Sequence, residues 1–167
     1  EERGALADGL THARKTADGS VVPYATRAEI EDGALAGQGL ELIWLADPVD
    51  TFFMHVQGSG RIRLPDGTTL RVTYDGKNGH PYTSIGRVLI DAGHFAPEDM
   101  TLAALKTWLA ADPDRGRKVM QENRSFVFFR ELAREEDGPL GGLEIPLSDG
   151  RSLAVDTGFH VLGTPVH

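Results

Sequence analysis

The chain has 167 residues, 40% of them apolar, a formal net charge of −8 and no cysteine. This length allows one domain or one and a half. The longest runs of Lys and Arg are Arg14-Lys15 and Arg117-Lys118, so the chain lacks the clustered cations of a nucleic-acid surface. The absence of cysteine excludes disulfides, thiolate nucleophiles and Cys-ligated zinc. No apolar run approaches the ~20 residues that span a bilayer, and no secretory signal pattern stands at the start.

The first segment with a clear local signal is a short helix. Residues 1–22 are polar and Gly-rich and look like part of a larger unit, and Pro23 ends them. Thr26-Arg27-Ala28-Glu29 fits a capping box, in which the Thr hydroxyl and the Glu carboxylate bind backbone N–H groups. Gly33 is suited to a left-handed helix end. These signals predict a helix over about 27–32.

Strand composition dominates the next part of the chain. Residues 40–45 and 51–56 are rich in β-branched, aromatic and aliphatic side chains and are bounded by Gly, Asp and Pro. This composition predicts two strands joined by a turn at 46–49. Residues 61–64 and 69–72 alternate polar and apolar around Pro65-Asp66-Gly67, which predicts a β-hairpin with one solvated face.

Helices are predicted in the second half. Thr83 or Ser84 can cap a helix through Leu89 that ends near Gly93. Apolar residues recur at helical spacing from Leu102 to Leu109, and Asp112-Pro113 begins a further helix with Pro at its first position. Together these two helices form a helical hairpin, and residues 126–129 follow as a buried strand. The chain is therefore predicted to be mainly β, with about four short helices.

Gln57-Gly58-Ser59-Gly60 interrupts an apolar run. Glycines there would let an extended ligand approach the backbone, with Gln57 and Ser59 supplying hydrogen bonds. A β-bulge or tight bend explains the same spacing, and spacing alone favours it. The segment 74–86 adds weight to the ligand hypothesis, because it crowds Asn, His, Tyr and hydroxyl side chains into a loop that leads into a helix.

The two unusual segments carry a family resemblance. Phe52-Phe53-Met54-His55-Val56-Gln57-Gly58-Ser59-Gly60-Arg61, followed by Asn78-Gly79-His80-Pro81-Tyr82-Thr83-Ser84-Ile85-Gly86-Arg87, resembles the membrane-bound lytic transglycosylase A (MltA) family. Further matching stretches extend the resemblance over about residues 22–166, including Thr26-Arg27-Ala28-Glu29, Phe128-Phe129-Arg130-Glu131 and Ser152-Leu153-Ala154-Val155-Asp156.

The resemblance implies a double-psi β-barrel split by an inserted β-rich domain, with a glycan strand of peptidoglycan bound in the groove between them. Residues 1–25 and 150–167 would be segments of a barrel that is incomplete in this chain. Residues 26–149 would be the inserted domain.

The implied activity is non-hydrolytic cleavage of the β-1,4 bond between N-acetylmuramic acid and N-acetylglucosamine, giving 1,6-anhydromuramoyl products. One Asp serves first as acid and then as base. In the register set by Val161-Leu162-Gly163-Thr164-Pro165-Val166, Asp156 supports the active centre, and the acid/base Asp is expected after His167. We expect Asp156 to accept hydrogen bonds from N–H groups of the Thr157-Gly158 turn.

The predicted substrate-binding residues lie around the two unusual segments and the first helix. They are Tyr24, Thr26, Phe53, Met54, Gln57, Gly58, Ser59, Gly60, Asn78, His80, Tyr82 and Ser84. Asn78 or His80 is expected to support the groove from behind its surface. Core packing is the alternative interpretation for Met54.

No metal site and no cofactor are predicted, because the six histidines have no metal-ligand spacing. The expected partner is the glycan strand of peptidoglycan and not nucleic acid. The expected location is the periplasm or cell envelope of a Gram-negative-type bacterium, with the signal segment and any outer-membrane anchor outside this chain. The alternative function is a non-catalytic module that binds peptidoglycan or another glycan.

Overall fold

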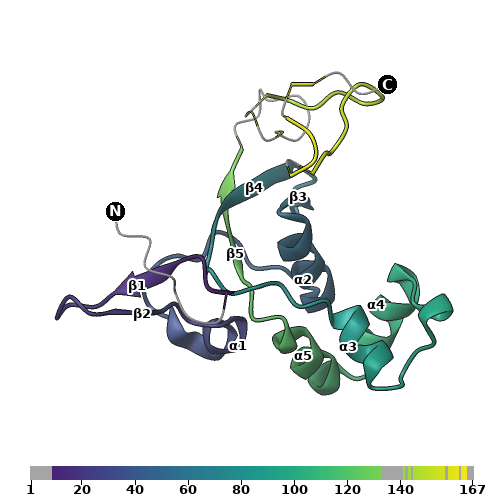
Figure 1. The fold of residues 1–167 in the computed structure, drawn as a ribbon, viewed down its shortest axis with the longest axis horizontal. Coiled ribbons are helices and arrows are strands. Elements are labelled where there is room, and N and C mark those ends of the chain that lie inside the picture. The colour runs from purple at the N-terminus through teal and green to yellow at the C-terminus, as the bar shows by residue number, and fades with distance from the viewer. Residues whose placement is uncertain are drawn as a thin grey trace. The chain divides into compact units, whose positions relative to one another are not determined.

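The computed structural model describes residues 9–132, 141, 143, 145–156, 158–161 and 163–164. Figure 1 shows the elements in chain order. The chain divides into one unit formed by residues 1–58 and 74–129 and a second formed by residues 59–73 and 130–167. The helices all belong to the first unit, which also contains every residue of the main hydrophobic core.

The N-terminal part of the first unit is a hairpin followed by a capped helix. Strands β1 (Ala13–Lys15) and β2 (Val21–Pro23) pair antiparallel. Helix α1 (Arg27–Glu29) continues into the π-helical turn η2 (Ile30–Ala34). The Thr26 N–H donates to Glu29 Oε2 at 2.7 Å, and the Glu29 N–H donates to Thr26 Oγ1 at 3.3 Å. The predicted capping box is therefore confirmed, as is the left-handed Gly33 (φ 102°).

Helix α2 (Pro48–Gln57) stands where the sequence predicted a turn and a strand over 51–56, so that prediction is wrong. Asp47 caps the helix, since its Oδ1 accepts from the N–H groups of Val49 and Asp50 at 2.8 and 3.0 Å. Pro48 occupies the first turn, where its missing N–H has no cost. Val49 and Phe52, three residues apart, bury the apolar face.

The predicted strand over 40–45 is also wrong. This segment has no regular secondary structure, and the side chains of Leu40, Leu42 and Trp44 are exposed. A strand needs a neighbour to satisfy its N–H and C=O groups. None of the strands in the described part of the chain pairs with this segment.

Gly58 ends helix α2 in the left-handed conformation (φ 76°), and its N–H donates to the Met54 carbonyl at 2.8 Å. Strand β3 (Ser59–Arg63) begins at once and pairs antiparallel with β4 (Thr69–Lys77), in register from Ser59↔Thr73 to Arg63↔Thr69. The predicted hairpin is confirmed. The bulge interpretation of the Gly-Ser-Gly segment is wrong, because a helix end explains the first glycine and the pairing continues without interruption.

Strand β5 (Val127–Glu131) completes a three-stranded sheet of order β3-β4-β5. It begins one residue later than the predicted strand over 126–129. The Leu132 N–H donates to the Arg71 carbonyl at 2.8 Å just beyond its end.

The predicted helices of the second half are confirmed. Helix α3 (Ile85–Asp91) is capped by Ser84, and the 3-10 turn η3 (Pro97–Asp99) leads to α4 (Leu102–Ala111) and α5 (Pro113–Glu122). These helices and α2 surround a core of buried residues: Val49, Phe52, Ile85, Leu89, Leu105, Leu109 and Met120. Helices α4 and α5 pack closely at Gly116, where a Cβ would lie 2.3 Å from the Leu109 carbonyl oxygen.

The architecture mixes short helices with two small sheets, and the described residues contain no closed barrel. An incomplete barrel was part of the predicted fold class. The proposed boundaries at residues 25 and 150 remain a prediction.

Candidate functional site

Asn78 holds together three segments of the first unit. Its Nδ2 donates to the Ala25 and Arg124 carbonyls, both at 2.9 Å, and its Oδ1 accepts from the Phe126 N–H at 2.9 Å and the His80 N–H at 3.4 Å. A carboxamide offers two donor hydrogens and two acceptor lone pairs. All are used, and the side chain is buried. Asn78 therefore fixes the backbone of these segments from the interior of the first unit, and its support of a glycan groove stays a prediction.

Asn123 plays a similar part at the end of helix α5. Its side-chain Oδ1 accepts from the Thr83 N–H at 3.1 Å and the Ser125 N–H at 3.2 Å. The first bond fixes the loop that leads to α3, and the second fixes the chain as it leaves α5. The loop 78–84 is thus tied at both ends to residues 123–126.

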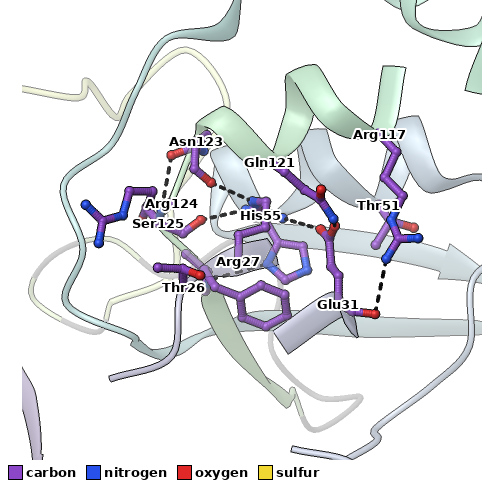
Figure 2. A network of polar contacts seen from close by, with 12 residues as sticks. Thr26, Arg27, Glu31, Thr51, His55, Arg117, Gln121, Asn123, Arg124 and Ser125 are labelled. Atoms are coloured by element: carbon purple, nitrogen blue, oxygen red, sulfur yellow. Dashed lines mark hydrogen bonds and ion pairs between the residues drawn. The ribbon is translucent and has the colours of Figure 1, made fainter. Parts of the chain in front are cut away.

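Arg27 lies in the middle of this arrangement with only 2% of its surface exposed. Its Nε donates to the Asn123 carbonyl at 3.0 Å and one Nη donates to the Ser125 carbonyl at 2.7 Å, while the other Nη pairs with Glu31 at 3.3 Å (Figure 2). Its guanidinium carbon lies 4.8 Å from the ring centre of Phe52. Burial lowers the pKa of Arg27, opposed by Glu31. The planar, forked guanidinium donates all of these hydrogen bonds at once, which stabilises its buried charge.

Ion pairs and hydrogen bonds continue this network onto helix α5. Glu31 Oε2 accepts from Gln121 Nε2 at 3.0 Å (Figure 2). Arg117 pairs with Asp32 at 2.6 Å. The second pair is exposed and contributes little by itself. Both contacts join η2 to α5.

His55 connects helix α2 to the same segment. Its Nδ1 accepts from the Val127 N–H at 3.3 Å, and its ring lies 4.4 Å from Phe126 and 5.1 Å from Phe129, measured between ring centres. Burial, followed by the charge of Arg27, lowers the pKa of His55 to about 3. His55 is therefore a neutral acceptor at physiological pH and not a proton donor.

A pocket of about 370 Å³ opens beside this network in the first unit. Its lining residues come from β1, β2, the helix that follows and the two loops described above: Arg14, Pro23, Tyr24, Ala25, Thr26, Glu29, Ala34, Leu35, His80 and Arg124. Three of the predicted substrate-binding residues, Tyr24, Thr26 and His80, therefore meet in one pocket.

The side chains of His80 and Thr26 make hydrogen bonds within the protein that stabilise the pocket wall. His80 is buried, and its Nε2 lies 2.7 Å from the Tyr24 carbonyl, which can only accept. This bond places the proton on Nε2, so that Nδ1 is an acceptor, and Nδ1 has no hydrogen-bond partner in the described structure. The Thr26 hydroxyl donates to Glu29 Oε2 at 2.8 Å.

The remaining predicted residues of the first unit lie elsewhere. Phe53 packs against the core and carries Lys106 Nζ 5.4 Å from its ring centre, and Met54 is half-buried on α2. Gln57 is exposed at the end of the helix, and Tyr82 is exposed in the loop. Ser84 caps α3 through the Arg87 N–H at 3.4 Å. Of these side chains, Gln57 and Tyr82 present polar groups to solvent.

Ser59, Gly60 and Asp156 belong to the second unit. Ser59 and Gly60 are paired in β3. Asp156 is exposed, and its Oδ1 accepts from the Gly158 N–H at 2.8 Å while its carbonyl accepts from the N–H groups of Phe159 and His160. The expected hydrogen bond from the turn after Asp156 is confirmed at Gly158, whereas Thr157 lies outside the described residues, as does the segment 165–167.

Arg14 and Arg124 are pocket residues that the sequence did not reveal. Neither belongs to a motif or a periodicity that would mark it. Glu29 was recognised as a capping residue, and only the fold places its carboxylate in the pocket.

Residues 3–130 match the family model described as the MltA specific insert domain. The chain belongs to the MltA family. It is 46% identical over 144 residues to a membrane-bound lytic murein transglycosylase A of Vibrio cholerae. The matched region is 84% of this chain and 38% of that relative. Among solved structures it is similar to a membrane-bound lytic murein transglycosylase from Agrobacterium tumefaciens, with a TM-score of 0.82, 38% identity and coverage of 91% of this chain and 41% of that one.

Another similar structure is that of Escherichia coli MltA with bound chitohexaose, with a TM-score of 0.74, 38% identity and coverage of 81% of this chain and 40% of the other. These likenesses confirm the predicted family and fold class. This MltA-family chain spans about two-fifths of the length of the relatives it matches.

Two further features are absent from the described ranges: a membrane-spanning helix and a cluster of metal ligands. No helix there combines the length and apolar character needed to cross a membrane. No three His, Asp or Glu side chains among those residues gather in a way that would hold a metal ion.

Proposed function

We propose that this chain is part of a peptidoglycan lytic transglycosylase that cleaves the β-1,4 bond between N-acetylmuramic acid and N-acetylglucosamine without water. The observation that carries the proposal is the 46% identity to the Vibrio cholerae lytic murein transglycosylase A over 84% of the chain. The structural likeness to a relative with bound chitohexaose supports a glycan as the ligand.

The proposed chemistry needs one carboxyl group and a well-held glycan. The carboxylic acid protonates the glycosidic oxygen, and the resulting carboxylate then takes the proton of the muramoyl 6-hydroxyl as that oxygen attacks the anomeric carbon. We assign this acid/base role to an Asp that residues 1–167 do not include. Asp156 is assigned a supporting role, because the Gly158 N–H holds its carboxylate as an anchored acceptor.

Glycan binding is assigned to the exposed polar groups near the two motifs. Gln57 and Tyr82 have side chains open to solvent, and sugar hydroxyl and N-acetyl groups require such donors and acceptors. Ser59 and Gly60 are assigned to glycan binding as well. Asn78, His80, Thr26 and Ser84 are assigned to the frame, because their hydrogen bonds are made within the protein.

The remaining residues of the predicted set support the glycan-binding surface through packing. Phe53, Met54 and Gly58 fix helix α2 and its end, so that Gln57 is presented at a defined place. Tyr24 supplies a pocket wall.

The test is product analysis. A protein that joins these residues to the remaining part of an MltA relative is incubated with purified peptidoglycan, and the soluble products are analysed by mass spectrometry. We expect 1,6-anhydromuropeptides, which are lighter than the hydrolysed products by one water. Reducing-end muropeptides alone would overturn the proposed reaction. Asp156→Asn in this protein should reduce activity in part, whereas complete loss with unchanged melting temperature and glycan affinity would make Asp156 the acid.

A second candidate is a glycan-binding module without turnover. It is supported by the likeness to a solved relative that holds chitohexaose. Binding of chitohexaose by the protein that joins these residues to the remaining part of an MltA relative, without any anhydro product from peptidoglycan, is the expected result for this candidate.

The proposed partner is the glycan strand of peptidoglycan, and the proposed location is the cell envelope of a Gram-negative bacterium. The names of the relatives, which describe membrane-bound murein transglycosylases, support this location. Attachment to the outer membrane through a segment outside residues 1–167 is part of the proposal.

A further inference from the structure

The pocket beside the Arg27 network contains charges of both signs. Arg14 and Arg124 contribute two cations and Glu29 one anion. The ion pairs made by Arg27, Arg87, Lys106 and Arg117 involve other carboxylates, and neither pocket guanidinium donates a hydrogen bond within the described residues. Both arginines are exposed and line the same pocket, and Arg124 interacts with Glu29 through its charge alone. Exposed guanidinium groups are suited to binding a carboxylate.

The two carboxylate oxygens of Glu29 have different roles: one caps the helix and the other is available to the pocket. Oε2 accepts from the backbone and hydroxyl of Thr26 at 2.7 and 2.8 Å. Oε1 accepts no hydrogen bond from the part of the chain that the structure describes. The bonds from Thr26, backbone first, lower the pKa of Glu29, so this carboxyl is ionised at neutral pH. The pocket therefore also offers a fixed acceptor for a cationic group.

The rest of the wall is apolar or already bonded. Pro23, Ala25, Ala34 and Leu35 provide apolar surface. The volume of about 370 Å³ lies at the lower end of the range for small-molecule sites, about 300–1,000 Å³. A ligand group that fits is small, partly aliphatic and charged at one end.

We propose that this pocket binds an α-amino-acid end group, in which one carbon carries both an ammonium and a carboxylate on an aliphatic chain. The two guanidinium groups of Arg14 and Arg124 bind the carboxylate, Glu29 Oε1 binds the ammonium, and the side chain of Leu35 lies against the methylenes. A simple anion, such as the lactyl carboxylate of N-acetylmuramic acid, would leave Glu29 Oε1 without a cationic partner. N-acetylglucosamine carries no carboxylate for the two guanidinium groups.

Two sources can present this chemistry: a free amino acid, or a diamino acid of a peptidoglycan stem peptide, whose second amino-acid end is not in the peptide chain. The stem peptide is the source we assign, and this choice rests on the proposed function. The pocket would then recognise the peptide on the glycan, while the exposed groups near Gln57 bind the sugars.

The experiment uses residues 1–167 and isothermal titration calorimetry with four probes. They are a muropeptide whose stem ends in diaminopimelate, the same disaccharide without peptide, free diaminopimelate, and pimelate, which lacks both ammonium groups. The variants Arg14→Gln, Arg124→Gln and Glu29→Gln remove the pocket charges one at a time. Lys15→Gln and Lys118→Gln are matched controls, because each removes one exposed positive charge outside the pocket.

We expect the muropeptide to bind more tightly than the peptide-free disaccharide, and each arginine variant to weaken muropeptide binding about tenfold, as for the loss of one charge-assisted hydrogen bond. The lysine controls should stay within about twofold, as expected for exposed charges outside the contact. Free diaminopimelate that shows the same arginine dependence, with an affinity equal to the muropeptide's, supports the pocket and makes the free amino acid the source. Unchanged affinity for muropeptide and diaminopimelate in both arginine variants overturns the proposal, as does equal affinity for pimelate and diaminopimelate.

The peptide-free disaccharide separates this inference from the proposed function. Arginine-dependent binding of diaminopimelate without any binding of the disaccharide supports the pocket and contradicts the glycan assignment. Binding of the disaccharide, with muropeptide affinity insensitive to Arg14 and Arg124, upholds the glycan assignment and overturns the pocket.

Discussion

Acidification should destabilise the first unit through His55, whose pKa is lowered from 6.5 to about 3 in the fold. Between these two values the unfolded chain binds a proton that the folded chain does not. The stabilising effect of a neutral His55 is therefore complete above pH 6.5 and is lost as the pH falls toward 3. With these two pKa values, the free energy of unfolding should be about 3 kcal/mol lower at pH 4.5 than at pH 7.

His55→Asn isolates this effect, because the Asn Oδ1 can accept from the Val127 N–H in place of Nδ1 and does not titrate. Loss of the ring between Phe126 and Phe129 should cost about 1–2 kcal/mol at pH 7. The variant should then be the less stable protein at pH 7 and the more stable one at pH 4.5. Carboxylates that titrate in the same range are common to both proteins and cancel in the comparison.

The assay is urea unfolding at pH 7.0, 6.0, 5.2 and 4.5, followed by Trp108 fluorescence in a Trp44→Phe background. Trp108 packs against the core, whereas Trp44 is exposed. His12→Asn is the control, since His12 is exposed and should keep the pH dependence of the parent. Parallel pH profiles for the parent and His55→Asn would refute the reasoning that His55 is buried in its neutral form.

Four other substitutions, one of them a control, test the Arg27 network, the helix packing and the glycan assignment. Arg27→Lys keeps the charge but loses the forked bonds to two carbonyls, and we expect urea unfolding to show a loss of about 2–4 kcal/mol; unchanged stability would contradict the network. Gly116→Ala should cost more than about 2 kcal/mol, because its Cβ meets the Leu109 carbonyl. Gly76→Ala, where the Cβ has no neighbour within 4 Å, should stay within about 0.5 kcal/mol of the parent, and equal losses at the two glycines would be inconsistent with close helix packing. Gln57→Ala should weaken chitohexaose binding about tenfold in calorimetry with no change in melting temperature, since the side chain is exposed; unchanged affinity would exclude Gln57 from the glycan site.

Local chemistry made several elements predictable. The capping box at Thr26, the Ser84 cap and the hairpin around Pro65-Asp66-Gly67 each depend on residues close in sequence, and all three form as expected. Helix α5 was found from Asp112-Pro113. The same Asp-Pro signal stands at Asp47-Pro48, but the aromatic and β-branched composition of residues 51–56 favoured a strand there.

The misassigned helix shows how packing overrides composition. Phe52 and Val49 are buried one helical turn apart, and Asp47 caps the N–H groups ahead of them. These helical contacts outweigh the weak preference of such side chains for strands. Gly58 is the end of this helix. Neither the bulge interpretation nor the ligand interpretation predicted a helix end there.

The candidate site was predicted only in part, because its geometry depends on contacts between distant residues. The motifs led to Tyr24, Thr26, Asn78 and His80, and the structure brings these together. No local pattern marks Arg14, which reaches the pocket through the pairing of β1 with β2.

The hydrogen bonds of the site also govern how it can form during folding. Arg27 binds carbonyls 96 and 98 residues away in sequence, and Asn78 binds carbonyls 53 and 46 residues away. Such contacts close long loops and therefore follow the local helices and hairpins in time. A growing chain that has not yet delivered residues 123–126 leaves the Arg27 guanidinium without its two carbonyl acceptors and the Asn78 amide with the Ala25 carbonyl alone. Ligand binding is accordingly expected to appear in one step, when that last segment joins, and not to increase gradually with the length of the synthesised chain.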